Sequence, residues 1–215
     1  MTRGKFIVFE GGEGAGKSTQ ARRLIGFLEE RNIPTVLTRE PGGTAGAEAI
    51  RTLLLDPPAI GEGWGSRAEA LLFAAARSDH VEKTIEPALA AGRWVVCDRF
   101  LASSVAYQGG AGGLGAHSLY ELHQFGSAGM LPDLTLILTI SPALTRNRLA
   151  KRDGEHTDAI SGRPAKYHRK VADAFATIAA DPRHKACSID ANAAEDEVFA
   201  SIRAAVQPLI EQRSR

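Results

Sequence analysis

Cysteine is scarce in this sequence: Cys97 and Cys187 are the only two among its 215 residues. Cys97 lies in a short apolar segment and Cys187 near another, so we expect reduced thiols in the cytosol rather than a disulfide framework. Long hydrophobic runs are also missing, and no stretch approaches membrane-spanning length. Because an apolar segment begins within a few residues of Met1, we expect no signal peptide. These absences favour a cytoplasmic protein with no membrane partner.

An excess of charge of one sign is absent as well. The 26 Lys and Arg residues are balanced by 25 Asp and Glu residues, which gives a formal net charge of +1. No global field therefore favours nucleic acid as a partner, and anion binding must come from local basic clusters. Repeats and low-complexity tracts are lacking. The length suits one α/β domain over residues 1–215, with a small lid inside it.

The clearest motif that is present fits the P-loop pattern G-x-x-x-x-G-K-[ST]. Its glycines let backbone N–H groups converge on phosphate oxygens, Lys17 can reach the β- and γ-phosphates, and the Ser18 hydroxyl can ligate Mg²⁺. The alternative is a glycine-rich turn with a chance lysine, but a strand-like segment precedes the motif and a helical one follows it. The motif predicts an ATP site with Mg²⁺, formed by Gly11, Gly12, Glu13, Gly14, Ala15, Gly16, Lys17, Ser18 and Thr19.

Strand-like and helix-like segments alternate along the whole chain, which predicts a doubly wound parallel sheet of five strands. We expect Pro87 either to kink the long third helix or to start a new segment. Residues 153–164 are polar without apolar periodicity, and a lid is expected at about 146–165. The expected strands are 5–10, 35–38, 94–97, 134–138 and 186–189. The expected helices are 17–31, one through 49–54, 67–89, 117–128, 142–152, 166–180 and 195–212, with a helix start and then a glycine cluster over 103–115.

Charged residues follow two of these strands, at the edge where a doubly wound sheet binds its ligands. Arg39 follows the second strand, and Asp98 and Arg99 follow the third. A carboxylate at Asp98 can hold Mg²⁺, usually through water, or it can cap the next helix. Arg99 suits bidentate phosphate contact, or it forms a surface salt bridge. With the P-loop, three signals thus fall on one edge of the sheet.

At this point the sequence resembles the thymidylate kinases. The resemblance runs from Phe6 to about Ile189 and is carried by several motifs together. It implies the nucleoside monophosphate kinase fold, transfer of the γ-phosphoryl group of ATP to dTMP to give dTDP, and a homodimer. The motifs are Asp98-Arg99-Phe100, Ser103-Ser104, Ala106-Tyr107-Gln108-Gly109, Arg39-Glu40-Pro41-Gly42-Gly43-Thr44, Leu72-Phe73 with Arg77, and Pro132-Asp133-Leu134-Thr135.

The resemblance also implies roles for individual residues in the dTMP site. An aromatic face suits a flat base, and several arginines suit a dianionic phosphate. Each residue has a plainer interpretation too, since Phe73 and Tyr107 can be core residues, Arg51 can be a solvated helix residue and Glu10 can cap a strand end. The implied roles are thymine stacking by Phe73, a bond from Arg77 to a base carbonyl, base-edge contacts by Ser104 and Gln108, exclusion of a 2′-OH by Tyr107, monophosphate binding by Arg39, Arg51 and Arg99, and a position near the 3′-OH for Glu13.

The transferring phosphoryl group also needs a cation, and the P-loop contains no arginine. Family members of this kind supply one from the lid, which usually carries an Asp-Arg pair followed closely by Glu. Here Asp158 is followed by Ala159, and the next arginine is Arg163. We expect Arg148 or Arg152, which lie four residues apart on one helix face, with Arg163 third and Arg146 and Lys151 also available. The predicted catalytic set is Lys17, Asp98, Arg99, Arg148, Arg152 and Glu13.

Three other functions compete with dTMP phosphorylation. Another nucleoside or nucleotide kinase, for example one acting on dUMP, shares the P-loop, but Tyr107, Phe73 and Arg77 together favour thymidylate. A GTPase switch usually carries Asn-Lys-x-Asp, which the sequence lacks. A non-catalytic nucleotide-binding module has little use for a second phosphate site.

Overall fold

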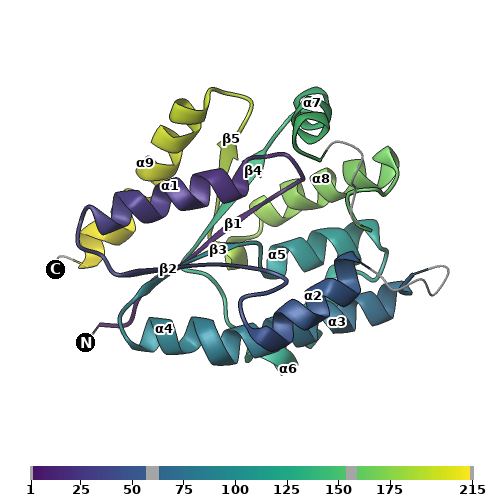
Figure 1. Ribbon diagram of the computed structural model, residues 1–215, viewed down its shortest axis with the longest axis horizontal. Coiled ribbons are helices and arrows are strands. Elements are labelled where there is room, and N and C mark those ends of the chain that lie inside the picture. The colour runs from purple at the N-terminus through teal and green to yellow at the C-terminus, as the bar shows by residue number, and fades with distance from the viewer. Residues whose placement is uncertain (1, 57–62, 154–158, 214–215) are drawn as a thin grey trace.

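The computed structural model describes residues 2–56, 63–153 and 159–213, without the side chains of 149–153. The fold is built on one all-parallel sheet (Figure 1). Within these ranges the strand order is β2-β3-β1-β4-β5. This confirms the predicted five-stranded, doubly wound sheet. The strands are β1 (Phe6–Gly11), β2 (Thr35–Arg39), β3 (Trp94–Asp98), β4 (Leu134–Thr139) and β5 (Ala186–Asp190).

The central strand β1 is buried along its whole length because helices cover both faces of the sheet. It pairs with β3 on one side and β4 on the other, with Ile7 opposite both Val96 and Leu134. Phe6 and Val8 belong to one hydrophobic cluster, and Ile7 and Phe9 belong to the other. The strand order reverses around β1, which places the ligand site at its carboxyl end.

Two helical layers enclose the sheet (Figure 1). The layer with α1 (Lys17–Glu29) and α9 (Glu195–Arg213) contributes Leu24, Leu28 and Ile202 to its cluster. The opposite layer is larger and also carries α2 (Ala45–Leu55), which packs on α3. Its other helices are α3 (Ser66–His80), α4 (Glu86–Ala90), α5 (Leu101–Ser104), α6 (Ala116–Ser127) and α8 (Ala165–Ala179). The helix α7 (Pro142–Asp153) follows β4, and a short 3₁₀ turn, η3 (Pro182–His184), precedes β5.

Of the two alternatives predicted for Pro87, the structure has the start of a new segment, and it corrects the predicted start of the helix after β3. The long third helix is interrupted by a π-helical turn, η1 (Val81–Ile85), and Pro87 lies in the first turn of α4, where its missing N–H is tolerated. The helix after β3 begins at Leu101 rather than Ser103, and it continues as a second π-helical turn, η2 (Val105–Ala111), through two glycines. No helix in the described ranges is long and apolar enough to cross a bilayer.

Candidate active site

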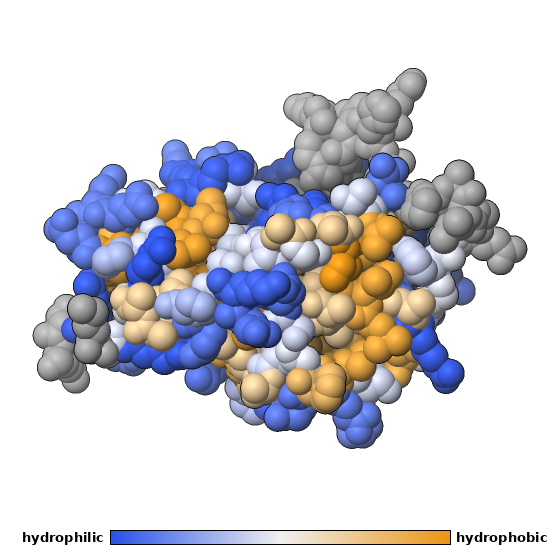
Figure 2. All heavy atoms as spheres, turned by 60° about the horizontal axis from the view of Figure 1, so that its bottom comes forward, coloured by the Kyte–Doolittle hydropathy of each residue, from blue (hydrophilic) through white to orange (hydrophobic). Residues whose placement is uncertain are grey.

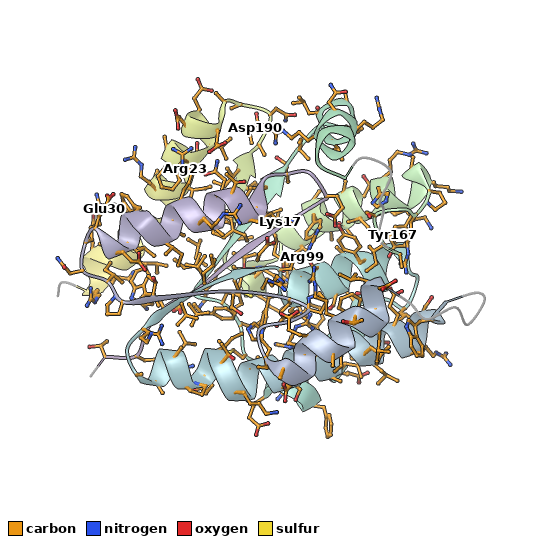
Figure 3. All side chains as sticks on the ribbon, in the orientation of Figure 1. Lys17, Arg23, Glu30, Arg99, Tyr167 and Asp190 are labelled. Carbon is orange, nitrogen blue, oxygen red and sulfur yellow. The ribbon has the colours of Figure 1, made fainter. Side chains whose placement is uncertain are left out.

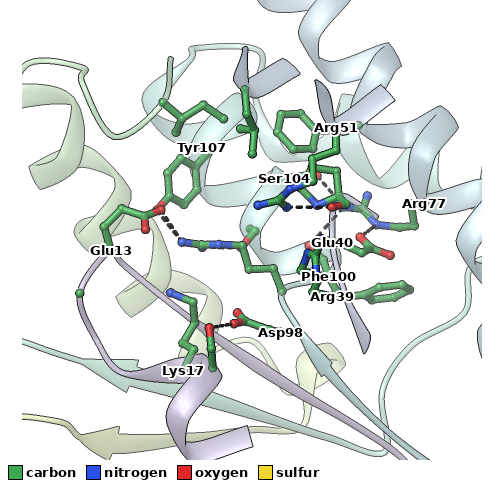
Figure 4. A pocket seen from close by; sticks show the side chains of 18 of the residues that line it. Glu13, Lys17, Arg39, Glu40, Arg51, Arg77, Asp98, Phe100, Ser104 and Tyr107 are labelled. Atoms are coloured by element: carbon green, nitrogen blue, oxygen red, sulfur yellow. Dashed lines mark hydrogen bonds and ion pairs between the residues drawn. The ribbon is translucent and has the colours of Figure 1, made fainter. Parts of the chain in front are cut away.

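A cleft of about 590 Å³ opens at the carboxyl ends of the central strands and brings the predicted residues together (Figure 4). Most of the predicted site lines this one cleft. The predicted residues on its wall are Glu13, Gly14, Gly16, Lys17, Ser18, Thr19, Arg39, Arg51, Phe73, Arg77, Asp98, Arg99, Ser104, Tyr107, Gln108 and Arg148. Gly11 and Gly12 lie at the base of the P-loop, and Ala15 lines a smaller adjoining pocket.

The P-loop joins β1 to α1 as the motif predicts. Gly11 must be glycine, because a Cβ there would lie 2.2 Å from the carbonyl oxygen of Leu138. Gly16 caps α1 in a left-handed conformation with φ of 87°, and no side chain caps the helix. The first N–H groups of α1 therefore face the cleft with the positive end of the helix dipole, which is the arrangement that binds phosphate.

Lys17 is buried in the P-loop, with 6% of its surface exposed. Its Nζ donates to the carbonyl oxygens of Gly11 at 3.2 Å and Gly12 at 2.8 Å. Burial, followed by the nearby charge of Arg99, lowers the pKa of Lys17 from 10.5 to about 8. The ammonium group is thus held at the phosphate-binding loop with an unusually acidic pKa.

Ser18 and Asp98 meet across the P-loop, since the Ser18 hydroxyl donates to the Asp98 carboxylate. These two hard oxygen donors fit Mg²⁺, which usually takes one or two protein ligands and completes its shell with phosphate oxygens and water. The described residues hold no cluster of three or more His, Cys, Asp or Glu side chains suited to a metal ion. The donor set therefore suits a metal that arrives with a nucleotide.

The alternative role of Asp98 as a helix cap is taken by another carboxylate, Glu10. This side chain is fully buried and accepts from the N–H groups of Phe100, at 2.9 Å, and Ser103, at 3.1 Å. It also accepts from the Ser103 hydroxyl at 2.6 Å. Burial raises the pKa of Glu10 from 4.5 to about 7. Glu10 thereby starts the helix at Leu101, earlier than the sequence predicts.

Arg99 lies at the junction of the P-loop and the second half of the cleft. It adopts a φ of 73°, a left-handed conformation that is rare for a residue with a side chain. Its guanidinium donates to Glu13 at 2.5 Å, to the Gly11 carbonyl at 3.0 Å and to the Ser103 hydroxyl at 3.0 Å. The Tyr107 hydroxyl lies 3.4 Å from Arg99 and donates to Glu13 at 3.3 Å. Arg99 is therefore an interior cleft residue and not part of a surface salt bridge.

The residues expected to hold a base line one face of α3 and the facing part of α5 and η2. Arg77 is 3% exposed, and its guanidinium donates to Glu40 at 2.8 Å, to Ser104 at 2.7 Å and to the Phe100 carbonyl at 3.2 Å. Phe73, four residues earlier, is half-buried, lines the cleft and also packs on the core. The ring of Phe73 thus belongs to both the core and the wall of the cleft.

The two arginines of the second strand and second helix flank the entrance to this region. Arg39 is exposed and donates to Glu48 at 3.1 Å. Arg51 is half-buried and donates to the Pro41 carbonyl at 2.9 Å, so it is not a fully solvated helix arginine. With Arg99, they give this half of the cleft three guanidinium groups, the donors suited to a dianionic phosphate.

The lid arginines separate into different environments. Arg148 lies against the P-loop, donating to the Gly14 carbonyl at 3.3 Å and to the Ala191 carbonyl at 3.1 Å. Arg146 is exposed. The side chains of Lys151 and Arg152 lie outside the described residues. Arg163 is not among the cleft-lining residues; it lies behind the other half of the cleft, where it pairs with Glu69, the partner of Gln108.

Sequence reasoning missed several residues that the structure places at the site. The buried carboxylate of Glu40 joins Arg77 to His80, whose Nδ1 lies 3.1 Å away and whose Nε2 lies 2.7 Å from Thr38 Oγ1. Glu69 accepts from Gln108 at 2.8 Å. Spacing carries one clue, because Glu69 precedes Phe73 by four residues on the same face of α3. Arg22, Pro41, Leu55, Phe100, Ser103 and Ile160 also line the cleft.

A P-loop with a hydroxyl–carboxylate pair, opening into a second pocket with arginines and an aromatic ring, defines a P-loop phosphotransferase that acts on two phosphate-bearing substrates. The family model described as thymidylate kinase matches residues 9–202. The chain belongs to the thymidylate kinase family, and it is an ATP-dependent kinase.

Curated relatives match over nearly the whole chain. The thymidylate kinase of Rhizorhabdus wittichii is 51% identical over 96% of this chain and 99% of its own length. That of Rhodopseudomonas palustris is 50% identical over 95% of this chain and 89% of its own. That of Symbiobacterium thermophilum is 44% identical over 98% of this chain and 96% of its own.

Proposed function

We propose that this protein transfers the γ-phosphoryl group of ATP to dTMP in the cleft described above, giving dTDP as a step toward dTTP. One observation carries the proposal: the phosphate-binding P-loop and a pocket with an aromatic ring, Arg77 and three further arginines share a single cleft. Family membership gives the substrates that this arrangement fits. Holding the two substrates in line is the main task of such a site, because phosphoryl transfer depends on positioning and charge stabilisation.

ATP binds on the P-loop half of the cleft. The N–H groups at the start of α1 and the Lys17 ammonium hold the β- and γ-phosphates. Ser18 and Asp98 would hold Mg²⁺, which would neutralise phosphate charge on the nucleotide. Residues 11–19 thereby fix the donor, and Asp98 orients the Ser18 hydroxyl through their hydrogen bond.

dTMP binds on the other half. Phe73 offers an aromatic face to thymine, Arg77 and Ser104 bond its polar edge, and Gln108 borders it. Arg39, Arg51 and Arg99 take the monophosphate, while Glu13 lies at the 3′-OH side. Tyr107 is 4% exposed and its ring packs in the core, which supports its role as the wall that excludes a ribose 2′-OH.

Arg148 supplies the cation for the transferring phosphoryl group. It lines both the main cleft and the adjoining pocket, and it already contacts the P-loop at Gly14. Arg152, four residues further on α7, stays an alternative, because its side chain lies outside the described residues. An arginine here stabilises charge that develops on the γ-phosphoryl oxygens.

The protein acts as a homodimer in the cytoplasm. Figure 2 shows apolar side chains gathered on the face that carries α2, α3 and α6. Three exposed apolar residues come from these helices, Leu53, Leu71 and Phe125, and Phe125 is 94% exposed. An apolar patch of this kind suits a partner with the same surface. Sedimentation of the two proteins tests this assembly. We expect wild type to sediment as a dimer and Phe125→Asp as a monomer. A wild-type protein that sediments as a monomer would contradict the proposal.

One assay tests the proposed reaction. Phosphoryl transfer from ATP is measured in parallel with dTMP, dUMP, dCMP and dGMP, and we expect the highest kcat/KM with dTMP. Preference for another monophosphate would assign the chain a different acceptor, and no transfer to any would contradict the proposal. In the same assay, Tyr107→Ala should raise the kcat/KM of ribo-TMP relative to dTMP, while an unchanged ratio would show that Tyr107 does not exclude the 2′-OH.

A further inference from the structure

Arg163, a candidate catalyst by sequence, belongs to a cluster at the back of the nucleoside half of the cleft. Its guanidinium forms an ion pair with Glu69 and donates to the Tyr167 hydroxyl at 2.6 Å. The Tyr167 hydroxyl in turn donates to the Tyr107 carbonyl at 2.8 Å, and the second oxygen of Glu69 accepts from Gln108 at 2.8 Å. Figure 3 shows Tyr167 at the start of α8, on the side of the molecule away from both chain termini.

This cluster is shielded from solvent. The Glu69 side chain is 8% exposed and that of Arg163 is 25% exposed. Exposed ion pairs contribute little, but a buried charge that loses its partner is strongly unfavourable. Glu69 is therefore held where Arg163 reaches it, and Gln108 is held by Glu69. The Tyr167 hydroxyl accepts from Arg163 and donates to the Tyr107 carbonyl, so it links Arg163 to the backbone at Tyr107.

The cluster connects three elements that each contribute to the acceptor pocket. Glu69 lies on the same face of α3 as Phe73 and Arg77, at successive spacings of four. Tyr107 and Gln108 lie on η2. The segment 159–167 contacts both of these elements, since Arg163 pairs with Glu69 on α3 and the Tyr167 hydroxyl donates to the Tyr107 carbonyl on η2. In the same segment, Ile160 lines the cleft.

We propose that Arg163 and Glu69 are positioning residues that fix the wall of the acceptor pocket and so set the affinity for the nucleoside monophosphate, rather than acting on the transferring phosphoryl group. The inference rests on the proposed acceptor half of the cleft. Arg163 holds Glu69, Glu69 holds Gln108, and Tyr167 holds the backbone of Tyr107 at the sugar. This gives a role to the arginine that stands five residues beyond Asp158, where the family pattern has an Asp-Arg pair.

The test compares Arg163→Gln, Glu69→Gln and the double variant with wild type. We expect the KM for dTMP to rise on the order of tenfold in each single variant, with kcat and the KM for ATP within about twofold of wild type. The double variant should be less impaired than the product of the single effects, because the two residues act as one unit. Titration calorimetry with dTMP alone should show the same loss of affinity. Arg169→Gln, on the exposed side of α8, is the matched control and should behave as wild type.

The outcomes separate the possible roles. A large fall in kcat for Arg163→Gln with unchanged KM for dTMP would make Arg163 a catalytic residue and overturn the proposal. Unchanged kinetics in both single variants would also overturn it. Arg163→Lys keeps the positive charge, so it should recover most of the dTMP affinity even if Arg163→Gln has a lowered melting temperature. If a folded Arg163→Lys protein fails to recover this affinity, the role proposed for the Arg163–Glu69 pair is contradicted. Wild-type transfer to dTMP in the same assay tests the proposed function separately.

Discussion

Lys17 should make ATP binding weaken with rising pH, well below the pH at which an ordinary lysine loses its proton. Burial and the charge of Arg99 lower the pKa of Lys17 from 10.5 to about 8, a difference of roughly 3 kcal/mol in favour of the neutral amine. Phosphate oxygens restore the protonated form, so above pH 8 each bound ATP requires uptake of a proton. The apparent Kd should then rise about tenfold between pH 7 and pH 9.

The assay is titration calorimetry with a non-hydrolysable ATP analogue at constant ionic strength. Repeating it at pH 9 in buffers of different ionisation enthalpy should reveal uptake of about one proton per analogue bound. Lys17→Arg is the control, because a guanidinium stays protonated throughout and should give a nearly flat profile. Burial raises the pKa of both Tyr107 and Cys97, so neither titrates over this range.

Two results would refute this reasoning. An affinity that stays constant from pH 7 to pH 9 would mean that Lys17 keeps its proton in the ligand-free protein. An equal loss of affinity in wild type and Lys17→Arg would assign the titration to another group.

Three further predictions concern single residues. Asp98→Asn should lower turnover strongly and raise the Mg²⁺ concentration needed, because an amide is a poor ligand for the ion; an unchanged Mg²⁺ titration would contradict this. The pKa of Glu10 is raised from 4.5 to about 7, so between these pH values the folded protein keeps a proton that the unfolded chain releases. The free energy of unfolding should therefore fall by roughly 3 kcal/mol as the pH rises from 4.5 to 7. Urea unfolding of Glu10→Gln at several pH values should lack this fall in the free energy of unfolding. If the free energy of unfolding changes with pH equally in Glu10→Gln and wild type, the contribution of Glu10 is excluded. Arg148→Ala should lower kcat, by up to ~10³-fold, with little change in the KM for ATP; a raised KM with normal kcat would limit Arg148 to ground-state binding.

The fold could be predicted from the sequence because its signals are local. Short apolar runs alternate with amphipathic stretches, and the P-loop glycines mark one strand-to-helix junction without ambiguity. The π-helical turns were not predictable in the same way, since an inserted residue leaves the amphipathic pattern nearly intact. The start of the helix at Leu101 was missed because it depends on Glu10, 90 residues away from the Phe100 N–H that it binds.

The site residues also differ in whether a local sequence signal marks them. Arg39, Asp98 and Arg99 are predictable because each stands at or just after the carboxyl end of a strand, and the resemblance to a family supplies Phe73 and Arg77. Carboxylates that act through partners distant in sequence gave no such signal. Glu40 is 37 residues from Arg77, and Glu69 is 94 residues from Arg163. A single sequence shows the residue types but not which of them pair across the fold.

Glu13 belongs to the P-loop, yet its carboxylate bonds to Arg99 and Tyr107 on the acceptor side. We therefore expect the two substrates to be thermodynamically linked through Glu13. A monophosphate that engages Arg99 changes the charge balance at Glu13, and Glu13 lies within the loop that holds ATP. Linkage is reciprocal, so whatever factor dTMP imposes on the affinity for ATP, ATP must impose on the affinity for dTMP. A substitution at residue 13 is therefore expected to change this shared coupling factor.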